Sequence, residues 1–276
     1  MLASAFSSAI GGLFVILVVL IGLAIYVTLA RQIAARRSIS VSDALSAPPS
    51  PRTFGLPEAF LAAALIFFLL LNITTAVEHS RAQLSSRDLI ANVLFTLFVV
   101  FFIAAFLKLR GIDIDALAGF SRASLKRAVS TGVVLLLAAA PLLALAEAFT
   151  QGVFGGESSK QEIVNLFNTS RTIEQRVTII VLVVVIAPIS EEFIFRFFIY
   201  GVLRRYCGIV IALVFNALLF AAAHTHLPSA APLFVLGGCF TLAYEWSGSI
   251  LVSMAMHALF NSAQLVLLAF PELFQQ

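Results

Sequence analysis

The chain has 276 residues, of which 61% are hydrophobic and 11% are charged, with a formal net charge of +3. A soluble domain has about 45–50% apolar and about 25% charged residues, so this composition excludes a soluble globular protein. The apolar residues form continuous runs without strand-like alternation, which excludes a transmembrane β-barrel. The sequence therefore predicts an all-α, polytopic integral membrane protein, a helical bundle with about eight transmembrane helices in a lipid bilayer.

Eight apolar runs, taken in chain order, are the predicted transmembrane helices. They cover residues 9–30, 58–77, 89–107, 131–150, 177–203, 208–226, 231–246 and 249–270. A linker rich in Ser and Pro, residues 38–57, follows the first run. The basic, amphipathic segment 108–130 is interpreted either as a helix on the membrane surface or as an ordinary solvated connector.

These runs divide the chain into four regions. Residues 1–37 form an N-terminal transmembrane anchor, and residues 38–57 form the linker. Residues 58–176 hold accessory transmembrane helices and the amphipathic connector, and residues 177–276 form a helical core with the chemically distinctive residues. We see no internal repeat.

The distribution of basic residues predicts the orientation of the chain. The connectors after the first, third, fifth and seventh runs hold 11 Lys and Arg residues, and the other connectors hold 5. Positive charge favours the cytoplasmic side, so the N-terminus is expected outside, with the protein in the cell membrane. Because the basic residues lie between apolar runs, they give no indication of nucleic-acid binding.

Two carboxylates and a guanidinium interrupt the fifth run: Glu191, Glu192 and Arg196. Ionisable groups inside a membrane cost about 2.5–3.5 kcal/mol each, so such a cluster is a functional candidate. Glu192 and Arg196 are four residues apart and share a helix face, which predicts an ion pair. Glu191 points about 140° away from Arg196 and is left free. The alternative is a purely structural polar knot of all three side chains.

Two later runs carry further polar residues at helical spacing. Asn216, Phe220 and His224 recur every four residues, and His257 and Asn261 are also four apart. One carboxylate, two imidazoles and an amide inside a bundle can form an active site. We expect Glu191 and His224 to hold a water and accept its proton. His257 and Asn261 are expected to donate hydrogen bonds to an oxyanion, as peptide hydrolysis requires.

Three motifs occur in order on these late runs: Glu191-Glu192-x-x-x-Arg196, Phe220-x-x-x-His224 and His257-x-x-x-Asn261. Together they resemble the CPBP family of CAAX proteases and bacteriocin-processing enzymes, also called Abi, which is related to the type II CAAX prenyl endopeptidase. The resemblance covers about residues 177–265.

The resemblance implies an intramembrane endopeptidase with the catalytic roles just given. Glu192, Arg196 and Phe220 are then supporting residues. One departure is Phe197, which stands where many members of the family carry Gly. His226 faces away from His224 on a helix and is expected at the helix end.

Several alternatives remain at this point. Glu191, His224 and His257 can also ligate zinc, although we favour a metal-free reaction without a cofactor, since no His-Glu-x-x-His motif is present. A non-catalytic bacteriocin-immunity or partner-binding protein and an ion or proton transporter are the competing functions. The expected partner is a peptide or membrane-protein substrate, and the oligomeric state is left open.

Overall fold

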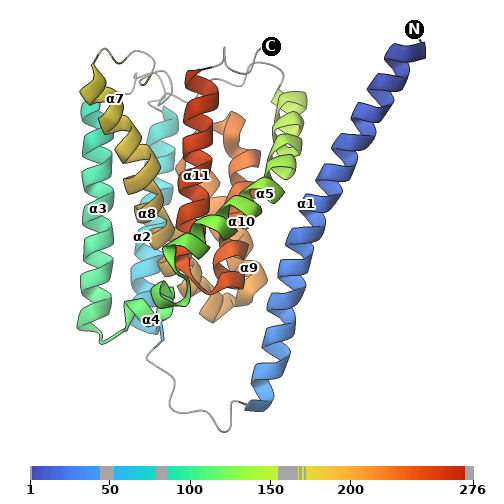
Figure 1. The fold of residues 1–276 in the computed structure, drawn as a ribbon. Helices are drawn as coiled ribbons and strands as arrows, with labels where there is room; N and C mark the ends of the chain where they lie inside the picture. Colours follow the sequence, from blue (N-terminus) through green and yellow to red (C-terminus); the bar gives the residue numbers. More distant parts are fainter. Residues whose placement is uncertain are drawn as a thin grey trace.

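The structure is a computed structural model that describes residues 2–43, 53–78, 86–154, 167, 170 and 172–270. Within these ranges every regular element is helical, which confirms the predicted all-α membrane bundle (Figure 1). The elements are α1 (Leu2–Asp43), α2 (Leu56–Glu78), α3 (Ser86–Leu109), α4 (Ile114–Ala118), η1 (Phe120–Arg122), α5 (Leu125–Phe154), α7 (Ile173–Ile180), η2 (Val181–Ile186), α8 (Ala187–Glu192), η3 (Phe193–Ile199), α9 (Tyr200–Ala223), η4 (Leu227–Ser229), α10 (Ala230–Ser247) and α11 (Ile250–Ala269).

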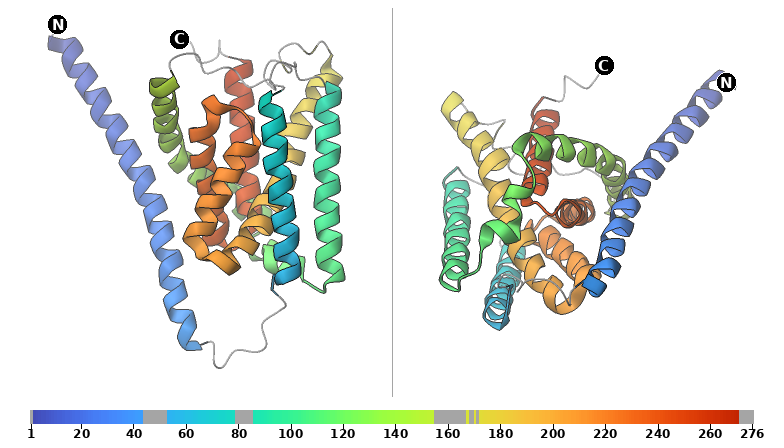
Figure 2. Two further views of the ribbon diagram at one scale, coloured as in Figure 1. Left: turned by 180° about the vertical axis from the view of Figure 1, so that it is seen from behind. Right: turned by 60° about the horizontal axis from the view of Figure 1, so that its bottom comes forward.

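Seven helical segments of the described chain are long and apolar enough to span a membrane. The fifth, Ile173–Ala223, would be about 76 Å long as one straight helix, more than twice the hydrocarbon core of about 30 Å. It is broken at Gly208, whose φ of 78° and ψ of 173° are accessible to glycine. The chain reverses there (Figures 1 and 2). The predicted runs 177–203 and 208–226 therefore lie on the two sides of this break.

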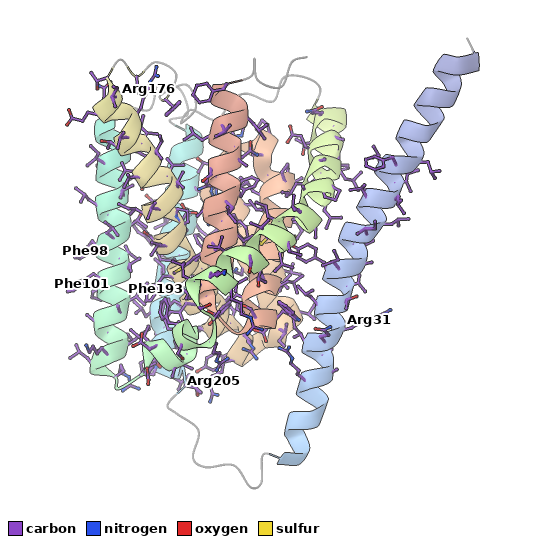
Figure 3. All side chains as sticks on the ribbon, in the orientation of Figure 1. Arg31, Phe98, Phe101, Arg176, Phe193 and Arg205 are labelled. Carbon is purple, nitrogen blue, oxygen red and sulfur yellow. The ribbon has the colours of Figure 1, made fainter. Side chains whose placement is uncertain are left out.

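The outer faces of the bundle are apolar, as a lipid-facing surface requires. Phe98 and Phe101 point outward from α3 and are 62% and 70% exposed (Figure 3). The interior holds fully buried large side chains, among them Arg196, Tyr200, Phe220 and Phe240. The charged residues of the fifth run are thus enclosed by protein. Burying their charges there is tolerated when they pair with one another.

Helix α10 lies inside the bundle and contacts α1, α5, α9 and α11 (Figure 2). Helix α5 also packs closely against α11. A Cβ added at Gly132 of α5 would lie 3.1 Å from the backbone nitrogen of Met256, the residue before His257. The absence of a side chain at Gly132 therefore lets α5 support the part of α11 that carries the candidate site. By contrast, the N-terminal part of α1 diverges from the bundle (Figures 1 and 2).

Two predicted connectors differ from the structure. Helix α1 continues to Asp43, six residues into the predicted linker 38–57, because neither Pro nor Gly interrupts it after Gly22. Residues 44–52 of that linker lie outside the described residues. A single surface helix over 108–130 is wrong: Gly119, with a φ of 69°, ends the short α4, and η1 separates it from α5.

Candidate active site

The predicted site residues come from three membrane-spanning segments. Glu191 and Glu192 are the last two residues of α8, and Arg196 follows in the π-helical η3. His224 is the C-terminal cap of α9, and His257 and Asn261 lie on α11. After Gly208, residues 209–223 rise only about 22 Å, less than the hydrocarbon core. His224 therefore ends its helix at a depth where it can meet Glu191.

Glu192 and Arg196 form the expected ion pair at the centre of the bundle. The Arg196 Nη1 lies 3.0 Å from the Glu192 Oε1, and both side chains are fully buried. The same Glu192 oxygen lies 2.9 Å from the Nδ1 of His257. One buried carboxylate thus binds a guanidinium from its own segment and an imidazole from α11.

Aromatic rings and a carbonyl complete the environment of Arg196. Its guanidinium carbon lies 4.1 Å from the ring centroid of Phe220 and 5.1 Å from that of Phe240, which are cation–π distances. Its Nη2 donates a long hydrogen bond of 3.5 Å to the Gly237 carbonyl. The ring of Phe240 also stacks on His257, with centroids 4.8 Å apart. These contacts hold the charged pair and His257 in one fixed arrangement.

Glu191 faces the two histidines rather than Arg196. Its Oε2 lies 4.0 Å from the Nε2 of His224 and 3.9 Å from the Nε2 of His257. The Glu191 and His224 side chains are 26% and 30% exposed, whereas His257 is 3% exposed. These separations are too long for direct hydrogen bonds and suit polar groups that share a water.

The other ring nitrogen of each histidine has a partner that determines the tautomer. His224 Nδ1 lies 2.8 Å from the Phe220 carbonyl, which can only accept, so Nδ1 carries the hydrogen. His257 Nδ1 likewise donates to the Glu192 carboxylate. In the neutral rings both Nε2 atoms therefore present lone pairs toward Glu191. A group that donates hydrogen, or a positive charge, is needed between these three acceptors.

Asn261 lies one turn beyond His257 and bonds to the backbone of another segment. Its Nδ2 donates to the Val183 carbonyl at 2.9 Å. Val183 lies in the π-helical η2, where Ala187 donates its N–H to the Leu182 carbonyl five residues back. In this pattern the N–H of residue 188 would next donate to the Val183 carbonyl, but Pro188 has no N–H. Asn261 supplies the missing donor.

Asn216, His226 and Phe197 make contacts other than those of the Glu191 cluster. Asn216 is buried and donates to the Thr241 hydroxyl, so it joins α9 to α10. His226 lies beyond the end of α9, as expected, and its Nδ1 is 2.7 Å from the Ser229 hydroxyl. Phe197 is buried against Phe54, with ring centroids 5.6 Å apart.

Sequence reasoning missed the Glu192–His257 and Asn261–Val183 contacts. Each joins residues more than 60 positions apart, and spacing within one helix carries no signal for such a contact. The one local signal was Pro188, whose missing N–H indicates a disturbed turn before it.

The ligand geometry bears on zinc. Ligand atoms 2.0–2.1 Å from a tetrahedral zinc lie roughly 3.3 Å from one another, closer than the 3.9 and 4.0 Å found around Glu191. Across the described ranges no group of three or more His, Cys, Asp or Glu side chains has the arrangement of a metal site. His224 and His257 each donate from Nδ1 to a protein oxygen, as metal-binding histidines do with the ring nitrogen that does not bind the metal. The donor chemistry is therefore compatible with a metal, whereas the distances around Glu191 are wider than a zinc site needs.

The fold and this cluster together define a multi-pass, all-α membrane protein with two histidines facing a partly exposed carboxylate. Comparison with known proteins finds a family model that matches the region holding this cluster. Residues 173–263, from α7 into α11, match the family described as type II CAAX prenyl endopeptidase Rce1-like. The resemblance expected from the three motifs is thus confirmed for this region.

A curated relative gives the same indication. The membrane-embedded CAAX protease MroQ of Staphylococcus aureus (strain USA300) is 30% identical over 115 residues. These residues are 40% of this chain and 45% of the relative, so the chain spans less than half of the length of the curated relative that it matches. No solved structure matches.

Proposed function

We propose that this protein is an intramembrane endopeptidase that hydrolyses a peptide bond in a peptide or membrane-protein substrate. The observation that carries the proposal is the position of the Glu191 Oε2, 4.0 and 3.9 Å from the Nε2 atoms of His224 and His257. A water between these three atoms would be held by a potential base and lie inside an apolar bundle. The family match and the protease activity printed in the name of the S. aureus relative support the same class.

In the proposed reaction, Glu191 and His224 bind a water and one of them accepts its proton. The water oxygen attacks the carbonyl carbon of the peptide bond, and a tetrahedral oxyanion forms. When this intermediate collapses, the C–N bond breaks and the accepted proton is transferred to the leaving amine. The partial exposure of Glu191 and His224 supports these roles, because water and substrate must reach them.

We assign stabilisation of the oxyanion to His257 and Asn261. His257 donates its Nδ1 hydrogen to Glu192, so it can donate from Nε2 only when the ring is protonated. Asn261 uses one amide hydrogen on Val183, and its second hydrogen is the proposed oxyanion donor.

Glu192, Arg196 and Phe220 are proposed as supporting residues. Arg196 neutralises Glu192, and Phe220 packs against both Arg196 and the His224 ring, whose centroid is 4.7 Å from that of Phe220. We propose that the reaction needs no metal or other cofactor. If zinc were present, Glu191, His224 and His257 would hold it, and it would polarise the substrate carbonyl and a bound water.

The test is a comparison of membrane proteomes from cells that express the wild type or Glu191→Gln. The variant keeps the side-chain volume but removes the base, so an uncleaved polypeptide should accumulate. Glu174→Gln, on the exposed first turn of α7, is the matched control and should behave like the wild type. A proteome that is unchanged in Glu191→Gln, with the variant present at wild-type level, would favour a non-catalytic partner-binding protein instead.

A further inference from the structure

A cavity of about 320 Å³ lies at the end of the bundle that carries Arg205 (Figure 3). It is built where the C-terminal half of α1, η1, the start of α9 and the end of α10 meet. Its polar lining, named here the basic cavity, consists of Arg36, Arg122, Arg204, Tyr244 and Glu245. Arg204 and His224 lie at opposite ends of α9, so the basic cavity is separate from the Glu191 cluster.

Glu245 carries the single carboxylate of the basic cavity, and each of its two oxygens has a partner. Its Oε1 lies 2.9 Å from Arg204 Nη2, and its Oε2 accepts a hydrogen bond of 3.0 Å from the Tyr200 hydroxyl. Glu245 therefore neutralises Arg204. The charge left in the cavity comes from the other two guanidinium groups.

Arg36 and Arg122 each contact a backbone carbonyl at the end of α10. The Arg36 Nη1 donates to the Trp246 carbonyl at 2.8 Å, and the Arg122 Nη1 donates to the Gly248 carbonyl at 3.4 Å. These bonds cap the helix end, but each uses one of five guanidinium N–H groups. Among the described residues neither arginine makes an ion pair, so two positive charges face the cavity.

We propose that the basic cavity binds a phosphate group through Arg36 and Arg122. Guanidinium forks match phosphate oxygens in charge and geometry, and two of them can hold one phosphate. The remaining lining includes the apolar Ile33, Leu117 and Ile209, which suit the glycerol and upper acyl chain of a phospholipid. Basic pockets between transmembrane helices on the cytoplasmic side are suited to anionic lipid head groups, so a lipid is the favoured source and a free phosphate is the other.

A bound phosphate would connect α1 with the helices that support the proposed active site. Trp246 donates its indole N–H to Gln32 of α1 at 2.7 Å, and its carbonyl accepts from Arg36. Binding at Arg36 and Arg122 would therefore hold α1 and η1 against the end of α10. This proposal does not depend on proteolysis by the Glu191 cluster.

The experiment uses Trp246 as the reporter, because it is the only tryptophan in the chain. Purified full-length protein in neutral detergent micelles is titrated separately with phosphatidylglycerol, phosphatidylcholine and inorganic phosphate, and Trp246 fluorescence is recorded. We expect a saturable change with phosphatidylglycerol, a much weaker one with phosphatidylcholine, whose choline cation offsets the phosphate charge, and weakening by added salt. A saturable response to inorganic phosphate alone would support the site with a soluble phosphate as its ligand.

Variants decide whether the response comes from the basic cavity. Arg36→Gln with Arg122→Gln should raise the apparent Kd by about tenfold or more, since both charge-assisted contacts are lost. Arg205→Gln also removes a positive charge, but at a residue beside the cavity and outside its lining, so it should leave the Kd unchanged. If the double variant does not fold, Arg36→Lys with Arg122→Lys keeps the charge and should still weaken binding. Equal responses to both lipids, no saturable response to any ligand, or an unchanged Kd in the variants would overturn the proposal.

Discussion

At the scale of single residues, the two adjacent glutamates have separate environments. Glu192 is fully buried and contacts Arg196 and His257 at 3.0 and 2.9 Å. Glu191 is partly exposed and faces two imidazole nitrogens at a distance that fits a shared water. The 100° between neighbouring residues of a helix produces this division, which gives one carboxylate to structure and leaves the other for chemistry.

This division predicts unequal effects of two matched substitutions on stability. Glu192→Gln leaves Arg196 buried without its ionic partner, and breaking such a pair costs about 3–5 kcal/mol. Glu191→Gln removes no close ion pair and should change stability by less than about 1 kcal/mol. Thermal unfolding of the purified variants in detergent should therefore show a large loss of midpoint temperature for Glu192→Gln alone. Equal losses for both variants would contradict separate roles.

A second prediction at this scale concerns metal. The 3.9 and 4.0 Å separations around Glu191 are wider than a zinc site needs, so we expect exhaustive chelation to leave proteolysis intact. The measurement is the cleavage rate in detergent before and after dialysis against a chelator. Loss of activity on chelation, with recovery on addition of zinc, would replace the water mechanism by a zinc mechanism.

At the scale of elements, the π-helical segments before and after α8 shape the site. The carbonyl of Val183 in η2 lacks a donor from Pro188 and accepts from Asn261 instead. The Asn261 side chain thereby links α11 to the backbone of the segment that carries Glu191. Irregular backbone inside a membrane is tolerated where protein groups satisfy it, and Asn261 is such a group.

This contact makes a prediction about coupling. Asn261→Ala leaves the Val183 carbonyl unsatisfied and should cost about 1–3 kcal/mol. Pro188→Ala restores an N–H at residue 188, so it should recover part of that loss in the Asn261→Ala background. A double-mutant cycle of unfolding free energies measures the coupling. Additive effects of the two substitutions would show that Pro188 and Asn261 do not act on the same carbonyl.

Much of the element order could be predicted from the sequence. The runs 231–246 and 249–270 correspond closely to α10 and α11, because Gly248 and Ser249 separate two strongly apolar stretches. The convergence of Glu191, His224 and His257 was expected because a carboxylate and two imidazoles inside a bundle can form an active site, and because the three motifs resemble one family. Of the two interpretations of 108–130, the single surface helix is wrong, since Gly119 adopts a positive φ and ends α4 there. The partners Val183, Gly237 and Phe240 are apolar or backbone groups without a distinguishing pattern.

At the scale of the whole molecule, the basic connectors gather at one end of the bundle. Arg31 and Arg205, which were assigned to one side of the membrane, lie toward the same end, and Arg176 lies at the opposite end (Figure 3). The same end holds the basic cavity. We propose that this end is cytoplasmic, with the N-terminus outside and the protein in the cell membrane, since positive charge is retained on the cytoplasmic side.

The two cysteines provide a test of this orientation. Cys207 is exposed and lies two residues after Arg205, whereas Cys239 is buried in α10. A membrane-impermeant maleimide should therefore label Cys207 in inside-out vesicles and not in intact cells. Cys207→Ala is the control and should abolish the labelling, because Cys239 is inaccessible. Labelling of Cys207 in intact cells would reverse the proposed orientation.

The most direct test of the central claim is the cleavage rate of the purified protein on the polypeptide that accumulates in Glu191→Gln cells. Wild type and Glu191→Gln are compared in liposomes at equal amounts of folded protein. Loss of a catalytic base should lower the rate by about 100-fold or more, while the unfolding temperature stays close to that of the wild type. A Glu191→Gln protein that cleaves within about fivefold of the wild-type rate would contradict the role of Glu191 in activating water.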